Sequence, residues 1–191
     1  AVLQGFVDRV DTWNNGQTSY YRVVDYKTGR KNFDYCDVFN GVGLQMLLYL
    51  FTLEKTGARR YGQEIVPAGV LYMPARDVLV RAKSNISDEE IIKERAKQLR
   101  RSGLLLQDPA VIEAMEHGDC PQFIPVKFGK DGRPAGESLA SLEQLGKLAG
   151  HIEKTLLALA KELRGGNIDA SPAFRSVQDN ACQWCDYREI C

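Results

Sequence analysis

Residues 5–11 read Gly-Phe-Val-Asp-Arg-Val-Asp, and residues 22–29 read Arg-Val-Val-Asp-Tyr-Lys-Thr-Gly. Both stretches contain apolar and β-branched residues, and they flank an Asn-Asn-Gly sequence at residues 14–16. This combination is a strong signal for a β-hairpin. We therefore expect paired strands over residues 2–12 and 20–27.

The predicted strands carry charged side chains where a sheet normally has Val or Ile. Asp25 and Lys27 are two residues apart, so they point to the same face, with Asp8 on the partner strand. Two carboxylates from adjacent strands suit magnesium or manganese, and a nearby lysine can hold a phosphate or polarise a water. A cross-strand salt bridge on a solvated face is the alternative. The Asp-x-Lys pair alone favours that salt bridge. Three observations shift the interpretation toward a phosphodiester-cleaving centre: the cost of unused carboxylates on apolar strands, the polar Gln45/Tyr49 pair on the following helix, and the strand-strand-helix-strand order.

Composition places the chain among soluble globular proteins. Its 191 residues fit one domain, with 44% hydrophobic and 26% charged residues. The formal net charge is zero, which gives no nucleic-acid signal by itself. No run approaches the roughly 20 apolar residues that span a bilayer, and no signal pattern is present, so we expect no membrane association. The chain opens without Met and looks like a piece of a longer protein.

Three of the five cysteines lie at the C-terminus, as Cys182, Cys185 and Cys191. A Cys-x-x-Cys pair with a third cysteine nearby is typical of a metal site rather than of a disulfide framework in a chain of this size. The residues alone favour zinc. This cysteine usage indicates a reducing, cytoplasmic setting.

A helix is predicted over residues 43–55, ended by Gly57, after an irregular connection at residues 32–40. Its apolar residues recur at helical spacing, whereas Gln45 and Tyr49 are four apart and share another face.

Further elements are expected downstream. They are strands at 65–73 and 78–82, helices at 87–101 and 108–116, a hairpin over 123–138, and a long helix at 141–164. The core stripe of the long helix is Leu142, Leu145, Leu148, Ile152, Leu156, Leu159 and Leu163. We interpret the basic cluster Lys97, Arg100 and Arg101 as a solvated, dipole-matched helix end rather than a DNA contact.

Together, residues 5–9, residues 24–28 and the Gln45/Tyr49 pair resemble the motifs of the PD-(D/E)XK nuclease superfamily, in its RecB-like branch. The cysteine tail looks like the iron–sulfur staple of some members. Residues 67–72 and 103–106 narrow the resemblance to the C-terminal nuclease domain of the AddB family, the second subunit of AddAB helicase–nucleases. The similarity covers essentially the whole chain.

The resemblance implies an α/β, restriction-endonuclease-like fold, with a mixed central sheet flanked by helices, a mostly helical insertion and a Cys-rich tail. We expect one nuclease domain over residues 1–191. Its parts would be a catalytic core (1–77), the insertion (78–140), the long helix (141–170) and the staple tail (171–191).

The resemblance also implies roles for individual residues. Asp8 and Asp25 would ligate Mg2+ or Mn2+ through their carboxylates, and Tyr26 through its backbone carbonyl. For the Tyr26 side chain, the structural prediction is plain core packing. Lys27 would position and activate the attacking water, while Gln45 and Tyr49 would orient Lys27 and the DNA strand. Arg9 and Asp11 would form a supporting salt bridge. Cys182, Cys185 and Cys191 would hold a four-iron four-sulfur cluster.

Two family features are missing from these motifs. The usual His or Glu ligand before the first strand would lie upstream of Ala1, and we interpret His117 and His151 as surface or packing residues. The fourth cluster cysteine would also lie upstream, since Cys36 and Cys120 have no motif context.

The implied function is metal-dependent hydrolysis of one unwound DNA strand during double-strand break processing and recombinational repair, in partnership with an AddA-type helicase–nuclease subunit. ATP binding would lie on that partner. One alternative is a non-catalytic module that guides DNA or docks the partner. Another is an interaction domain with a zinc-ribbon tail.

Overall fold

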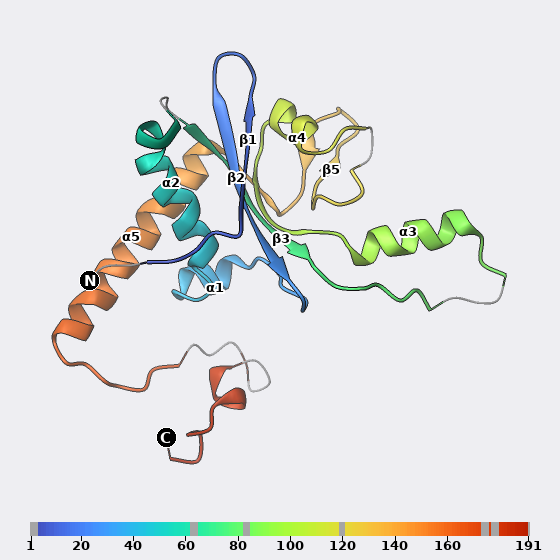
Figure 1. The fold of residues 1–191 in the computed structure, drawn as a ribbon. Helices are drawn as coiled ribbons and strands as arrows, with labels where there is room; N and C mark the ends of the chain where they lie inside the picture. The colour runs from blue at the N-terminus through green and yellow to red at the C-terminus, as the bar shows by residue number, and fades with distance from the viewer. Residues whose placement is uncertain are drawn as a thin grey trace.

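The computed structural model describes residues 4–61, 65–81, 85–118, 121–172, 176 and 180–190. Its centre is a mixed five-stranded sheet in the order β1-β2-β3-β4-β7 (Figure 1). These strands are β1 (Arg9–Asn14), β2 (Ser19–Lys27), β3 (Ile65–Pro74), β4 (Ser102–Leu106) and β7 (Leu139–Ala140). The β2/β3 and β4/β7 pairs are parallel, and the β1/β2 and β3/β4 pairs are antiparallel. The mixed central sheet flanked by helices confirms the predicted fold class.

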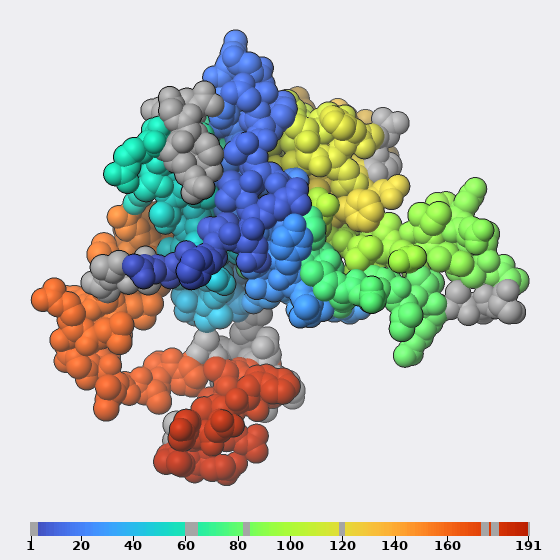
Figure 2. Space-filling model, in the orientation of Figure 1, coloured from blue at the N-terminus to red at the C-terminus, as the bar shows by residue number. Residues whose placement is uncertain are grey.

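The helices surround this sheet. They are α1 (Tyr35–Phe39), α2 (Gln45–Tyr61), α3 (Asp88–Gln98), α4 (Pro109–Met115) and α5 (Leu142–Arg164), with a 3-10 turn at Ala181–Trp184. The α1 and α2 helices form the crossover between the parallel strands β2 and β3, a connection that normally needs a helix. The α3 helix and the C-terminal tail project from the body of the molecule (Figure 2).

The sheet buries apolar side chains on both faces. Val23, Val70 and Leu104 belong to the larger cluster, together with buried residues of α2 and α5. Val24 and Leu71, their immediate neighbours in sequence, point to the other face and belong to a smaller cluster. This follows from the two-residue period of strands. Asp25 and Lys27 have the same parity as Val23, so the charged pair lies on the face that α2 covers.

The hairpin forms as predicted, but its first strand is shorter than expected. The β1 strand begins at Arg9, and residues 4–8 run outside the ladder. In the β1/β2 register Arg9 is opposite Val24, so one more pair would set Asp8 against Asp25. Like charges directly opposite one another destabilise a sheet. The chain leaves the ladder at this point, and Asp8 is exposed rather than held on an apolar strand.

Two glycines allow close approaches around β3. Gly69 has a φ of 131°, and a Cβ there would lie 2.2 Å from the Leu104 carbonyl oxygen; the β2/β3 register shifts beside it, as in a β-bulge. Gly57 lies inside α2, which continues to Tyr61, so the prediction that it ends the helix is wrong. A Cβ on Gly57 would lie 2.2 Å from Ile65 Cδ1, so the glycine lets α2 pack onto β3.

The middle of the chain differs from the prediction in several elements. Residues 32–40 contain the short helix α1, and residues 78–81 form no strand. Residues 78–140 hold α3 and α4, but they also supply β4 and β7 to the central sheet. The expected hairpin at 123–138 is reduced to β5 (Lys127–Phe128) and β6 (Pro134–Ala135). The insertion is therefore partly built into the sheet.

Helix starts are confirmed where the sequence has capping signals. Ser87 and Ser141 form capping boxes with Glu90 and Gln144, and Asp108 caps α4 ahead of Pro109.

The stripe of α5 is buried only in the first half of the helix. Leu145, Leu148 and Ile152 are buried, whereas Leu142, Leu159 and Leu163 are 52%, 46% and 74% exposed. Leu156 still packs against the larger cluster, but α5 then extends beyond the sheet (Figure 1), so Leu159 and Leu163 have no core to enter. Among the described helices, none combines the length and apolarity that a membrane span requires.

Candidate active site

The centre of the site is the C-terminal end of β2. Lys27 Nζ lies 2.5 Å from Asp25 Oδ2, as the two-residue spacing predicts. The Asp25 residue is only 9% exposed, while the Lys27 side chain is 37% exposed. Burial of a carboxylate is costly unless it is paired with an opposite charge. The Lys27 ammonium supplies that opposite charge for Asp25.

Asp8 joins this pair through the backbone. Its Oδ2 accepts a hydrogen bond of 3.1 Å from the backbone N–H of Tyr26, the residue that follows Asp25. The two carboxylates are therefore held at one end of β2, one buried in the sheet and one exposed just outside it. The structure brings together the three charged residues predicted from the hairpin.

The donor set fits a magnesium-type ion. Asp25 Oδ2 is buried and accepts no hydrogen bond from the described residues, although Lys27 is in ionic contact with it. No third His, Cys, Asp or Glu joins the two carboxylates within the described ranges. Mg2+ commonly binds through one or two carboxylates while keeping waters and substrate phosphates as its other ligands. Asp8 and Asp25 offer the two carboxylates that this mode of binding uses.

Gln45 and Tyr49 lie on α2 and contact each other. Gln45 Nε2 donates a 2.9 Å hydrogen bond to the Tyr49 hydroxyl, as their one-turn spacing predicts. A Cβ on Gly5 would lie 2.5 Å from that hydroxyl, so Tyr49 lies against the segment that leads to Asp8. Neither residue is hydrogen-bonded to Lys27 in the part of the chain that the structure describes. Tyr49 instead lies against the segment before β1, and Gln45 is bonded to Tyr49.

A salt-bridge network supports the hairpin beside the carboxylates. Arg9 Nε donates to Asp11 Oδ1 at 2.6 Å, as predicted, and Arg22 Nε donates to Asp11 Oδ2 at 2.9 Å. Burial alone would raise the pKa of Asp11, but the hydrogen bonds from Arg9 and Arg22 outweigh it and lower that pKa. Arg9 also donates to the Tyr26 hydroxyl. The Tyr26 side chain is 42% exposed, so the prediction that it packs in the core is wrong.

Tyr72 is a neighbour of the site that sequence reasoning missed. It pairs directly with Asp25 in the β2/β3 register and is buried. Burial raises the pKa of Tyr72, and the nearby carboxylates of Asp25 and Asp37 raise it further. The sequence places Tyr72 in the predicted strand 65–73, but only the β2/β3 register shows that it lies beside Asp25.

The predicted surface and packing histidines behave as expected. His117 is exposed and lies 3.2 Å from Glu113, and His151 packs edge-on against Phe39. Neither approaches the two carboxylates.

The cysteine tail is described only in part. Cys182 and Cys185 are free thiols at the 3-10 turn, and Cys185 Sγ accepts a hydrogen bond from the Tyr187 backbone N–H at 3.4 Å. Cys191 and Cys120 lie outside the described residues, and Cys36 is exposed on α1.

With the fold and the charged centre in place, comparison with known proteins decides the family. The model of the PD-(D/E)XK nuclease superfamily matches residues 1–191. The chain belongs to this superfamily. The mixed sheet and the carboxylate–lysine pair at the end of β2 are thus features of a PD-(D/E)XK nuclease domain.

Curated relatives of this PD-(D/E)XK chain are described as the second (B-type) subunits of ATP-dependent helicase/deoxyribonucleases. The protein from Thermoanaerobacter sp. (strain X514) is 36% identical over 99% of this chain and 16% of its own length. Those from Clostridium kluyveri and Clostridium novyi are 37% and 36% identical, each over 99% of this chain and 17% of their own length. The resemblance to the AddB family is confirmed, and the chain spans about one sixth of these relatives.

Proposed function

We propose that this nuclease domain hydrolyses phosphodiester bonds of one unwound DNA strand in a metal-dependent reaction, as part of an AddAB-type helicase–nuclease. The observation that carries this proposal is the buried Asp25 oxygen beside Lys27, with Asp8 bound to the next backbone N–H. The family and the names of the relatives support a deoxyribonuclease subunit. Exonucleolytic action, magnesium dependence and a role in double-strand break repair are parts of the proposal.

Each residue of the centre has a chemical task in this proposal. Asp8 and Asp25, with the backbone carbonyl of Tyr26, would hold Mg2+ or Mn2+, and such an ion would stabilise charge on the scissile phosphate. Lys27 orients the attacking water and places positive charge beside the phosphate. Arg9 and Asp11 hold the hairpin so that the two carboxylates stay together. Tyr49 packs against the segment before Asp8, and Gln45 and Tyr49 would present an amide and a hydroxyl to the DNA strand.

We further propose a structural iron–sulfur cluster on Cys182, Cys185 and Cys191. The backbone hydrogen bond to Cys185 Sγ is of the kind that stabilises cluster thiolates. Zinc is the alternative for the same thiolates. Iron and sulfide analysis of anaerobically purified protein distinguishes the two metals, and this chain alone, with three such cysteines, should hold the cluster poorly.

The proposed partners are DNA and an AddA-type helicase–nuclease subunit, on which we place ATP binding, in the cytoplasm. The support for a partner is the description of the relatives as one subunit of a helicase/deoxyribonuclease.

The test uses the full-length protein with its partner subunit and a duplex labelled on one strand at a time. Asp8→Ala and Lys27→Ala should abolish cleavage of one strand and leave unwinding intact. Lys130→Ala removes an exposed cation from the β5–β6 turn and should change neither activity. Continued cutting of both strands by the Asp8 and Lys27 variants would refute the assignment.

The second candidate function is a module that guides DNA or docks the partner without cutting. The observation in its favour is that the described residues supply only two acidic ligands. If it is correct, the wild-type protein will leave that strand intact in Mg2+ and in Mn2+ while still binding it.

A further inference from the structure

A pocket of about 400 Å³ opens next to Lys27, and six of its thirteen lining residues are cations. We call it the basic pocket; its charged lining residues are Lys27, Arg30, Lys31, Arg76, Lys97 and Arg100, with Glu94 as the one acid among the described lining residues. The chain as a whole has no net charge. This concentration of positive charge is therefore local, and it adjoins the site at Lys27.

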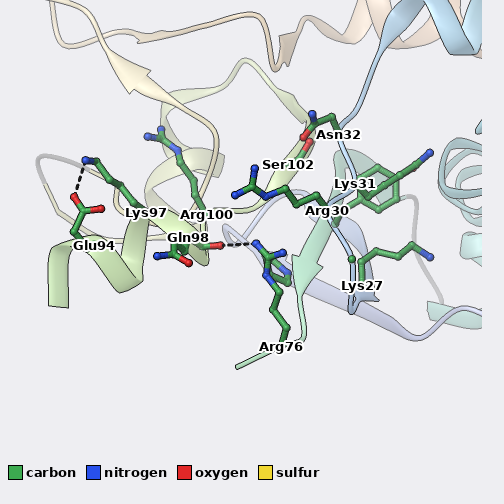
Figure 3. Close-up of a pocket in the computed structure, with 13 residues that line it drawn as sticks. Lys27, Arg30, Lys31, Asn32, Arg76, Glu94, Lys97, Gln98, Arg100 and Ser102 are labelled. Carbon is green, nitrogen blue, oxygen red and sulfur yellow. Dashed lines mark hydrogen bonds and ion pairs between the residues drawn. The ribbon is translucent and has the colours of Figure 1, made fainter. Parts of the chain in front are cut away.

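The cations come from three separate parts of the fold. Arg30 lies after β2, Arg76 lies after β3, and Lys97 and Arg100 lie at the end of α3 and just beyond it. In Figure 3 the Arg30 guanidinium points across the pocket toward the α3 side, while Lys27 and Lys31 project their ammonium groups the other way. A helix dipole explains a basic residue at the end of α3, but it does not explain the convergence of Arg30 and Arg76 on the same space.

Two of the arginines are fixed by backbone carbonyls. Arg76 donates to the Gln98 carbonyl at 3.4 Å, and Arg100 donates to the Val126 carbonyl at 3.1 Å. Neither bond neutralises a charge. Lys97 is paired with Glu94 at 2.8 Å on the exposed side of α3, and Arg30 has no ion pair or hydrogen bond to any residue that the structure describes. The cations of the pocket thus outnumber the acids that the described residues place beside them.

The chemistry of the lining selects a phosphate-bearing ligand. Arginine guanidinium groups and lysine ammonium groups are the usual protein partners of phosphate oxygens. The remaining polar side chains, which include Asn32, Gln98 and Ser102, are neutral, and Tyr72 adds an aromatic wall. Phosphate contacts position a nucleic acid without reading its sequence, so this lining favours sequence-independent binding.

We propose that the basic pocket binds the sugar–phosphate backbone of the single strand next to the bond that is cut. This inference rests on the proposed function, because Lys27 is both a wall of the pocket and the lysine of the site. Because the proposed substrate is one unwound strand, we expect the pocket to take single-stranded rather than duplex DNA. The proposal adds a DNA contact to Lys97 and Arg100, which the sequence alone indicates as a solvated, dipole-matched helix end.

The test measures binding of fluorescein-labelled oligodeoxythymidine to the full-length protein without divalent metal, over a range of salt concentrations. The Arg30→Ala/Lys97→Ala double variant removes one cation from each side of the pocket. Its affinity should be about tenfold weaker, and the slope of log affinity against log salt should fall by about 1.4, near 0.7 for each phosphate contact to a single strand. In cleavage assays KM should rise more than kcat falls, because uniform binding is lost.

The matched control is Lys161→Ala/Arg164→Ala, which removes two exposed cations from the far end of α5, on the other side of the molecule (Figure 1). It should bind like the wild type. The inference is overturned if the two double variants bind alike, or if unlabelled duplex displaces the oligonucleotide as well as single-stranded DNA does. If instead the wild type cleaves nothing in Mg2+ or Mn2+ but the binding difference persists, the nuclease proposal fails and the pocket stands.

Discussion

Asp11 is held by two arginines from adjacent strands, and this contact makes hairpin stability depend on pH. The pKa of Asp11 lies below its ordinary value of 3.8 in the folded chain, because the hydrogen bonds from Arg9 and Arg22 outweigh its burial. A lowered folded pKa means that the stabilisation is complete above the ordinary value and is lost as the pH falls through the folded one. Asp11→Asn should therefore lower the free energy of unfolding by about 1 kcal/mol at pH 7, and by less as the pH drops below about 4.

Denaturant unfolding of the wild type and the variant at pH 7, 5, 4 and 3 measures this difference. Asp169→Asn, a change at an exposed residue beyond α5, is the control and should leave the stability unchanged. A difference between wild type and Asp11→Asn that stays constant down to pH 3 would contradict the prediction.

At this scale the sequence predicts contacts that depend on spacing along one element. The pairs Asp25–Lys27 and Gln45–Tyr49 follow from the periods of a strand and a helix. Contacts that depend on register or packing could not be predicted in this way. Tyr72 lies beside Asp25 only because of the β2/β3 register, and Gly5 meets Tyr49 only through the path of the segment before β1.

Among the elements, the packing of α2 on β3 depends on Gly57. Gly57→Ala would place a Cβ 2.2 Å from Ile65 Cδ1 and 2.6 Å from Ile65 Cγ1, so a buried side chain or the helix must move. Overpacking of this kind costs about 1–3 kcal/mol, which outweighs the gain of about 1 kcal/mol in helix propensity. We expect Gly57→Ala to lower the urea midpoint of unfolding.

The matched control is Gly146→Ala in α5, where an added Cβ meets nothing within 4 Å. This substitution should raise stability by about 0.5–1 kcal/mol, because only the backbone entropy of glycine is removed. Equal gains in stability at both positions would show that α2 does not need the close approach to β3.

Elements with strong local signals were predictable, and short elements were not. The capping boxes at Ser87 and Ser141 mark the starts of α3 and α5. The α1 helix and the strands β4 and β7 have at most five residues each, which is too short for a periodic pattern. The strands β4 and β7 depend on the sheet that they join.

On the scale of the whole molecule, the hydrophobic period of a helix does not show which residues are buried, and the net charge does not show where charges cluster. The stripe of α5 is regular, yet its last leucines, Leu159 and Leu163, are exposed and lie outside the core. A net charge of zero coexists with a strongly basic pocket beside Lys27. Sequence averages carry no information on where side chains gather, so the family motifs identified the site while the pocket required the folded chain.

The central claim is that Asp8, Asp25 and Lys27 form a metal-dependent nuclease centre. The most direct measurement is the rate at which the full-length protein with its partner cuts the strand assigned to this domain, titrated with Mg2+ or Mn2+. The account predicts no cutting of that strand in EDTA, a saturable increase with metal, and a rate at least about 100-fold lower for Asp25→Asn, with unwinding unchanged. Cutting of that strand by Asp25→Asn at the wild-type rate, or by the wild type in EDTA, would contradict the account.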